Sequence, residues 1–503
     1  MDWLEAINNA ISGGGFSMSE GMVNEASRQL EDALKKAQDG VGTVGYQTEP
    51  GMDGSAEFSP LFTQSIDHVL ADATTFSEED FVMWDLMPKD KATQTLHEIR
   101  SRVTHGDRFL DHSSAEGEAG VNDVSTFAAT SVQIKFWTAR RELTNVAANM
   151  PSQGVLVNGG LLADQTKEAM LMLMRTLEVD CLWGDSSVND LKTDGLITQI
   201  EAAGQYQDLE GSQLSFDRIE RKISELSNVD IGAKPTHLFV TNNVWHDLSL
   251  QAQDGAGRFV KDGEITGRNF TFGSTGLQVF SHNSKRRIKV EPVPFLDIQK
   301  AFGSPFTPDT ALTNSPVVVP RASPEGTAPD AIAITSQPTA TGDASSKFKT
   351  EDAGTYKYYF MGVNEGGHTM PLASSTVAVA AGQIVTTVLT APTTYFSRYI
   401  MVFRTDSTGV SNTAQYLFTV KQGTTTTTIV DKNIDRRGCS RVLLANMADT
   451  KELAFYRLLP LARVPLAQIK LKIPFVLFMS GAVKVKVPRK QWIWKNVGVS
   501  NPL

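Results

Sequence analysis

The segment from 323 to 437 constrains the fold most, because it predicts β-structure throughout and helix nowhere. Short runs rich in Val, Ile, Thr and Tyr alternate with clusters of Gly, Pro, Asn and Ser. The expected strands are 331–334, 354–363, 376–379, 384–389, 399–404, 416–420 and 425–430. About seven short strands in about 110 residues are typical of a β-sandwich. Acidic and basic side chains balance here, so we expect no strong field on its surface.

The flanking chain differs, since it mixes helix and strand signals. Helices are expected at 163–182, 215–227 and 244–252, and strands at 237–241, 277–281, 441–445, 469–473, 475–479 and 483–487. A length of 503 residues predicts two or three domains. We therefore expect a larger α+β domain that a small sandwich interrupts. In the helix at 163–182, the side chains Met170, Met172, Met174 and Leu177 are interpreted as core packing rather than as an adaptable binding face.

Two alternating strands, Thr95–Arg102 and Ser131–Glu142, flank a long polar loop. A loop of this length inside a compact domain is usually functional or disordered. We expect an extended hairpin that reaches a neighbour.

The N-terminal part predicts an arm rather than a domain. A weakly apolar helix is expected at 19–38, followed by a Gly-rich tether at 39–59, and short amphipathic turns at 61–70 and 81–86.

Composition excludes several classes of protein. The formal charge of −9 argues against a protein whose main task is to hold nucleic acid. Only Cys181 and Cys439 occur, which excludes a disulfide framework and favours a reducing compartment. The N-terminus does not resemble a signal peptide, and the apolar run Ile473–Val483 is too short to span a bilayer. We expect a soluble protein without a membrane partner.

No nucleotide-binding loop, nucleophile elbow or zinc-protease helix occurs, and we expect no catalytic residue, no cofactor and no metal. His97, His105 and His112 cluster in sequence, but their spacing favours a solvated loop over a metal site. Glu78, Glu79 and Asp80 favour the first turn of a helix over an acid/base pair. A basic stretch near the end of the sequence could suggest nucleic-acid binding, but it alternates as a half-buried strand does. Its residues are Lys484, Lys486, Arg489 and Lys490, with Trp492 and Trp494.

The order of these features resembles the HK97-type major capsid proteins of tailed bacteriophages. The residues that carry the resemblance are Thr74–Lys89, Ala92–Glu98, Leu459–Ala462, Pro465–Ala467, Pro474, Phe475, Gly481, Val487–Lys490 and Lys495–Val497. It covers about 60–300 and 438–500. Within the insertion, Gly354–His368 and Pro371–Ser375 are similar to fibronectin type III and related Ig-like domains.

The resemblance implies an HK97-like α+β fold with an inserted all-β Ig-like sandwich. Its parts would be an N-terminal arm (1–59), the start of the peripheral domain (60–94), an extended loop (95–142), a spine helix with the axial and peripheral α+β domain (143–322), the insertion (323–437) and a return to the capsid core domain (438–503).

The resemblance also implies self-assembly into hexamers and pentamers of an icosahedral head, built in the host cytoplasm and found in the virion. Portal and scaffolding proteins are expected partners, cement proteins are possible ones, and packaged double-stranded DNA would be a non-specific neighbour. The candidates for intersubunit contacts are Glu98, Arg100, Arg102, Asp107, Arg108, Lys135, Arg140 and Arg141. Solvated strand faces would explain these charges equally well. No motif identifies a lysine–asparagine cross-link, so we expect no covalent bond between subunits.

Two alternatives stay open. One is an encapsulin-like compartment, which shares the fold but would enclose an enzyme. The other is a glycan- or surface-binding adhesin that uses tyrosines of the sandwich as a stacking platform: Tyr356, Tyr358, Tyr359, Tyr395 and Tyr399.

Overall fold

The computed structural model describes most of the chain after residue 79. The described residues are 80–107, 110, 111, 113, 114, 116, 122–145, 160–228, 231–259, 277–281, 286–303, 328–468 and 471–499. The helix expected at 19–38, the tether at 39–59, the turn at 61–70 and the carboxylates of Glu78 and Glu79 lie outside them.

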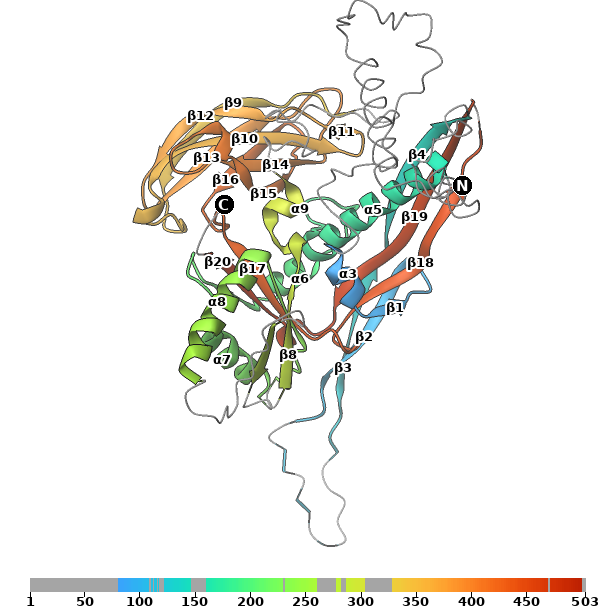
Figure 1. The fold of residues 1–503 in the computed structure, drawn as a ribbon, viewed down its shortest axis with the longest axis vertical. Helices are drawn as coiled ribbons and strands as arrows, with labels where there is room; N and C mark the ends of the chain where they lie inside the picture. The colour runs from blue at the N-terminus through green and yellow to red at the C-terminus, as the bar shows by residue number, and fades with distance from the viewer. Residues whose placement is uncertain are drawn as a thin grey trace, which may run out of the picture. The chain divides into compact units, whose positions relative to one another are not determined.

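A six-stranded mixed sheet joins strands from both sides of the interrupting segment, in the order β5-β20-β17-β6-β8-β7 (Figure 1). Its strands are β5 (Tyr206–Asp208), β6 (His237–Val240), β7 (Leu277–Ser281), β8 (Arg286–Pro292), β17 (Ser440–Ala445) and β20 (Trp492–Val497). Because β17 lies between β20 and β6, the chain returns to this sheet after the interruption. The expected strands at 237–241, 277–281 and 441–445 are confirmed.

Helices flank this sheet. They are α6 (Leu196–Ala202), α7 (Phe216–Leu226) and α8 (Asn242–Phe259). The short helix α9 (Ile298–Phe302) follows β8 and contacts β15 instead. The Ser215 hydroxyl accepts the Arg218 amide at 3.4 Å, which caps α7 where the sequence predicted. Its apolar stripe of Ile219, Ile223 and Leu226 is fully buried.

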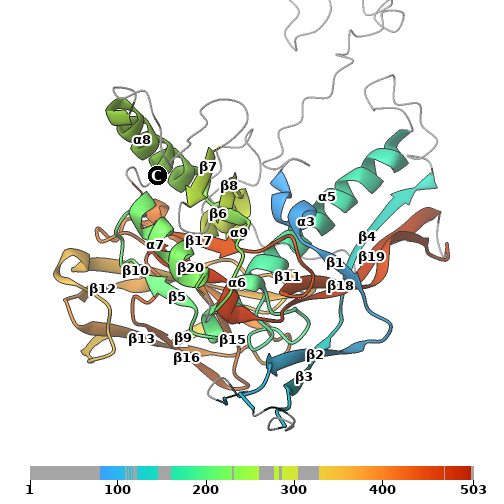
Figure 2. The same cartoon turned by 90° about the horizontal axis from the view of Figure 1, so that it is seen from below.

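A four-stranded sheet has the order β1-β18-β19-β4 and carries the long helix α5 (Gly160–Trp183) on one face. Its strands are β1 (Lys89–Lys91), β4 (Lys135–Thr144), β18 (Leu453–Pro465) and β19 (Lys472–Val485). Figure 2 also shows α5 beside β4 and β19. The short helix α3 (Val82–Leu86) contacts α5. The three strands expected between 469 and 487 are one continuous strand, β19.

The interpretation of the methionines on α5 is half right. Met174 and Leu177 are buried, as expected for core residues, whereas Met170 and Met172 are exposed. The prediction was wrong for the latter two: Met172 lies on the side of α5 opposite Met174 and Leu177, whereas Met170 shares their side of the helix but is left uncovered.

The prediction of one strand at Ser131–Glu142 is wrong, because the chain divides at Ile134 into strands of two different sheets. Strand β2 (Leu96–Thr104) pairs with β3 (Thr126–Gln133), whereas β4 pairs with β19. Ile134 is 2% exposed and its amide donates to the Thr95 carbonyl at 2.8 Å. The hairpin is therefore β2–β3.

Residues 328–437, here called the two-sheet unit, form two antiparallel sheets. One has the order β11-β10-β14-β15 with β12 beside β10, and the other is β16-β13-β9. The strands are β9 (Ala333–Gly342), β10 (Gly354–Asn364), β11 (Gly367–His368), β12 (Leu372–Val379), β13 (Gln383–Thr390), β14 (Tyr399–Arg404), β15 (Gln415–Lys421) and β16 (Thr426–Asp431). All seven expected strands are found, although the first prediction ended eight residues early.

Both sheets of the two-sheet unit contribute to one core. Phe360 from β10 packs there with Leu389 from β13 and Ile429 from β16. Tyr356, Tyr358 and Tyr359 are buried as well. Three of the five tyrosines of the expected stacking platform are therefore packing residues.

Candidate assembly surface

The β2–β3 hairpin has almost no core of its own. It forms a separate two-stranded sheet, and nearly all its side chains are exposed or half-exposed on both faces (Figure 1). Among the described residues only its base is anchored, where Ile99 packs with Ile134 and Tyr456 and the His97 ring lies 4.3 Å from that of Tyr456. An isolated two-stranded ribbon is marginally stable in water. The hairpin therefore needs a further partner along its length.

Large apolar side chains lie on this hairpin and in its loop. Leu96, Val103, Val124 and Phe127 are between 55% and 69% exposed. Single exposed apolar residues are ordinary, but several on one thin ribbon mark an interaction site. Phe127 lies 5.4 Å from the Arg102 guanidinium, which leaves most of the ring uncovered.

The eight predicted contact residues separate into three groups. Glu98 and Arg100 pair with each other at 3.0 Å, and Arg102 lies 3.3 Å from His105 Nδ1. The backbone amide of Asp107 donates to the Asp123 carboxylate at 3.1 Å. Those residues lie on the hairpin. Arg108 lies outside the described residues.

The remaining three candidates belong to β4 and not to the hairpin. Lys135 donates to the Gln133 side chain at 3.0 Å and to the Asp190 carbonyl, while Arg140 and Arg141 lie opposite Val476 and Phe475 of β19. The structure thus divides the predicted set between two surfaces. Their role between subunits stays a prediction.

The face of the four-stranded sheet opposite α5 carries a second apolar surface, here called the bare face. Phe136 of β4 stacks on Phe478 of β19, with ring centroids 6.0 Å apart. Leu459 and Val464 of β18 are also exposed. Register places these side chains on one face, since Phe478 lies opposite Ala462 and Thr138, and Val464 opposite Val476. Sequence analysis missed this surface, because β18 was not predicted.

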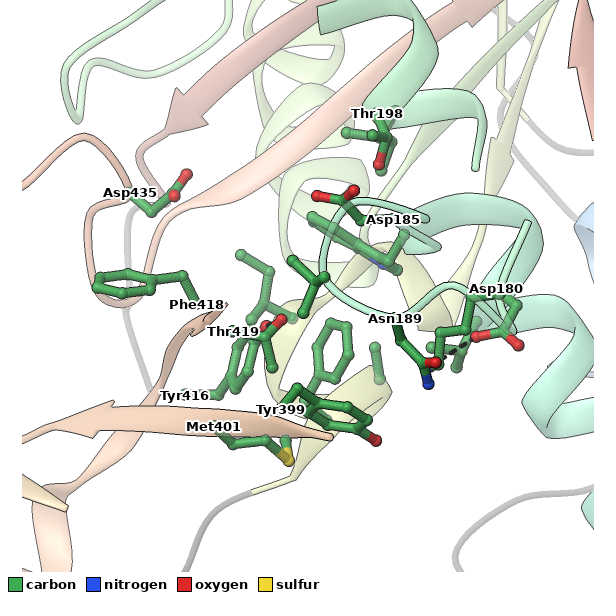
Figure 3. A pocket seen from close by; sticks show the side chains of 18 of the residues that line it. Asp180, Asp185, Asn189, Thr198, Tyr399, Met401, Tyr416, Phe418, Thr419 and Asp435 are labelled. Carbon is green, nitrogen blue, oxygen red and sulfur yellow. Dashed lines mark hydrogen bonds and ion pairs between the residues drawn. The ribbon is translucent and has the colours of Figure 1, made fainter. Parts of the chain in front are cut away.

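A cavity of about 440 Å³ lies where the two-sheet unit meets the rest of the chain. Figure 3 shows Tyr399, Tyr416 and Thr419 on one side of it, and Asp180, Asp185 and Asn189 on the other. Its volume is that of a small-molecule site. Most of its charged side chains, however, already form ion pairs with one another, which leaves a charged ligand little to bind.

Asp180 pairs with Lys192 at 2.8 Å and accepts the Trp137 indole N–H at 2.9 Å. Asp435 pairs with both Arg441 and Lys495 at 2.8 Å. Burial opposes ionisation of Asp435, but these two cations outweigh it and hold its pKa below the usual value. These ion pairs connect separate parts of the fold around the cavity.

The sequence also predicted no metal site, no disulfide framework and no nucleic-acid-binding stretch. Among the described residues no group of three or more His, Cys, Asp or Glu could hold a metal ion, and His112 lies outside them. Cys181 and Cys439 are both free thiols. Trp494 is fully buried, so it cannot stack on a base, and Val483 and Val485 are buried while Lys484 is half-exposed. The strand interpretation is confirmed for 483–485, whereas Lys486 follows the end of β19, and Arg489 and Lys490 lie in a 3-10 turn, Pro488–Lys490. Within the described part of the chain, no helix combines the length and apolar character needed to cross a membrane.

Comparison with known proteins gives no match to a family model and none to a curated protein. Among solved structures, the chain is similar to an encapsulin of Synechococcus elongatus PCC 7942, with a TM-score of 0.43, 6% identity and coverage of 89% of this chain and 97% of that one. Gordonia phage Cozz gives a TM-score of 0.42 at 9% identity, covering 90% and 98%. The capsid of a native GTA particle gives 0.41 at 7% identity, covering 90% and 100%.

Proposed function

We propose that the chain is a structural subunit that self-assembles into the hexamers and pentamers of an icosahedral phage head enclosing double-stranded DNA. The observation that carries this is the pair of apolar surfaces, the β2–β3 hairpin and the bare face, which one subunit leaves exposed. Removing such apolar surfaces from water favours association. Many repeated contacts of this kind give a closed shell its stability.

The order of elements supports an HK97-like fold. An extended hairpin precedes a long helix that lies along a sheet, and the last strands of the chain return to that sheet and to the six-stranded one. This is the order that the sequence resemblance implied.

The two-sheet unit fits an Ig-like insertion domain. Two antiparallel sheets share one core, and the strands before and after it, β8 and β17, belong to the same six-stranded sheet. The proposed domains keep the bounds given above except at the extended loop, which we end at Gln133 because β4 pairs with β19 in the four-stranded sheet.

The experiment is to compare assembly of the wild type with that of Phe127→Ser, alone and with its scaffolding partner. Sedimentation velocity and negative-stain microscopy would measure the fraction in closed shells or rings. Tyr395→Ser is the matched control, because Tyr395 is also an exposed aromatic residue but lies in the two-sheet unit. We expect loss of assembly for Phe127→Ser only. A wild type that stays monomeric or dimeric under every condition would overturn the proposal.

The packaged content tests the remaining alternatives. Particles that protect double-stranded DNA from nuclease support a phage head, whereas particles that enclose an enzyme support an encapsulin-like compartment. The burial of Tyr356, Tyr358 and Tyr359 removes the main support for an adhesin.

A further inference from the structure

The two-sheet unit is a candidate for free motion, because inserted domains usually move relative to their parent unless a large apolar interface holds them. The contacts between this unit and the rest of the chain decide the matter. They consist of an apolar part and a polar part.

The apolar part is modest. Ile298 and Phe302 of α9 pack on the outer face of the β10–β14–β15 sheet. The Phe302 ring stacks on that of Tyr416, with centroids 4.2 Å apart and planes 15° from parallel. The Gln299 amide donates to the Tyr416 carbonyl and accepts its N–H, both at 3.3 Å. One short helix would not by itself prevent rotation.

Most of the polar part lies in the segment from Asp431 to Arg441, here called the linker, which runs from the end of β16 to β17 of the six-stranded sheet. Two more exposed pairs lie outside it, Arg398–Asp190 at 3.0 Å and Lys349–Glu210 at 2.7 Å. The first residues of the linker are tied to the two-sheet unit. Asp431 pairs with the buried Arg404 at 2.7 Å, and the Asn433 side chain accepts from Arg404 at 2.8 Å and donates to Asp352 at 3.2 Å. Asn433 adopts φ of 57°, a left-handed conformation that asparagine tolerates better than most residues.

Its later residues are tied to the rest of the chain. The Ile434 carbonyl accepts from the Asn496 side chain at 2.8 Å. Asp435 pairs with Arg441 of β17 and Lys495 of β20, and Arg441 also pairs with Glu201 of α6 at 2.8 Å. These charged groups are largely buried, so water and salt screen them little.

Arg436 contacts both sides at once. Its guanidinium pairs with Asp352 of the two-sheet unit at 2.9 Å, and its backbone N–H donates to Asn496 Oδ1 of β20 at 3.0 Å. A rotation of the unit about the linker would have to break these bonds together with the Asp435 pairs.

We infer that the linker from Asp431 to Arg441 is a clamp that fixes the two-sheet unit on the rest of the subunit, so that the two move as one rigid body. The unit is then presented at a constant angle rather than on a flexible tether. This inference does not depend on what the subunit assembles into.

Distances between two spin labels, one on each side of the clamp, test this directly. The labelled chain carries Arg221→Cys on α7 and Thr428→Cys on β16, both at exposed positions, with Cys439→Ser to spare the linker. Cys181 is fully buried and stays unlabelled. Dilution with unlabelled full-length protein confines the measured pairs to single chains.

We expect a narrow distance distribution in the clamped chain, and one about twofold wider in the double variant Asp435→Asn with Arg436→Gln, as for a freed domain. Asp343→Asn is the matched control, since it makes the same chemical change at an exposed turn of the two-sheet unit. A broad distribution in the clamped chain, or an unchanged one in the double variant, would overturn the inference. If the double variant fails to fold, Arg436→Gln alone serves, with the same two outcomes.

Discussion

The β2–β3 hairpin and the two-sheet unit are both built from antiparallel strands, yet they place their apolar residues oppositely. The two-sheet unit buries Phe360, Leu389 and Ile429 between its layers. The hairpin leaves Phe127, Val103 and Leu96 in solvent. The difference teaches that the two-sheet unit carries its own stability, whereas the stability of the hairpin must come from contacts with other surfaces.

Replacing one phenylalanine in each region gives the sharpest contrast. Phe360→Ala removes a fully buried ring and should lower the free energy of unfolding by about 3–5 kcal/mol. Phe127→Ala should change that of the isolated subunit by less than about 0.5 kcal/mol. Urea unfolding of both variants under non-assembling conditions measures this. Equal losses would mean that the hairpin is part of the subunit core.

Breaking an ion pair should likewise lower the free energy of unfolding more in the two-sheet unit than in the hairpin. Arg404→Met leaves the Asp431 carboxylate buried without its 2.7 Å partner, which should cost about 3 kcal/mol. The same variant tests the base of the clamp, because Arg404 also holds Asn433. Thermal unfolding followed by circular dichroism gives the loss. A fall of only a few tenths of a kcal/mol would show that solvent reaches this pair.

A buried carboxylate on α5, beside the short helix α3, adds a pH dependence. Burial raises the pKa of Glu178 to about 8, although its oxygens accept the Met83 and Trp84 amides at 2.9 and 2.8 Å. The unfolded chain ionises this group first, so its contribution to stability is complete below pH 4.5 and is lost as pH rises to about 8.

Glu178→Gln should remove this slope, which is at most about 1.4 kcal/mol per pH unit. Urea unfolding of both proteins across that range gives the difference. Parallel curves for the wild type and the variant would show that Glu178 does not titrate in this way.

The smallest effect is expected at the hairpin's own ion pair. Glu98→Gln breaks a contact to Arg100 between side chains that are 55% and 80% exposed, and should change subunit stability by less than about 0.5 kcal/mol. Thermal unfolding measures this change, and assembly yield measured beside it shows whether Glu98 acts between subunits. A normal yield would remove Glu98 from the predicted contacts.

The sequence by itself determined the strands of the two-sheet unit and the extent of α5 and α7. These elements have strong local signals: alternation bounded by turn residues in the first case, and helical spacing with the Ser215 cap in the second. The apolar hairpin residues could also have been noted, since Phe127 and Val124 follow a polar loop.

Only the tertiary structure decided where strands change partner. No local signal predicts that the strand is interrupted at Ile134, because neither neighbouring residue is Gly or Pro. The interruption arises because β3 pairs with β2 while β4 pairs with β19. The local pattern did not predict strand β18, which contains Pro460 and Pro465, and only the resemblance of Leu459–Ala462 to C-terminal strands of the capsid family pointed to it. The pairing of β18 with β1 ends at Arg457. Among the described residues, the edge of β18 that faced β1 therefore has no partner strand at Pro460 and Pro465, and the missing proline N–H groups remove no hydrogen bond on that edge. The bare face and the clamp follow from such long-range pairings, which local patterns do not encode.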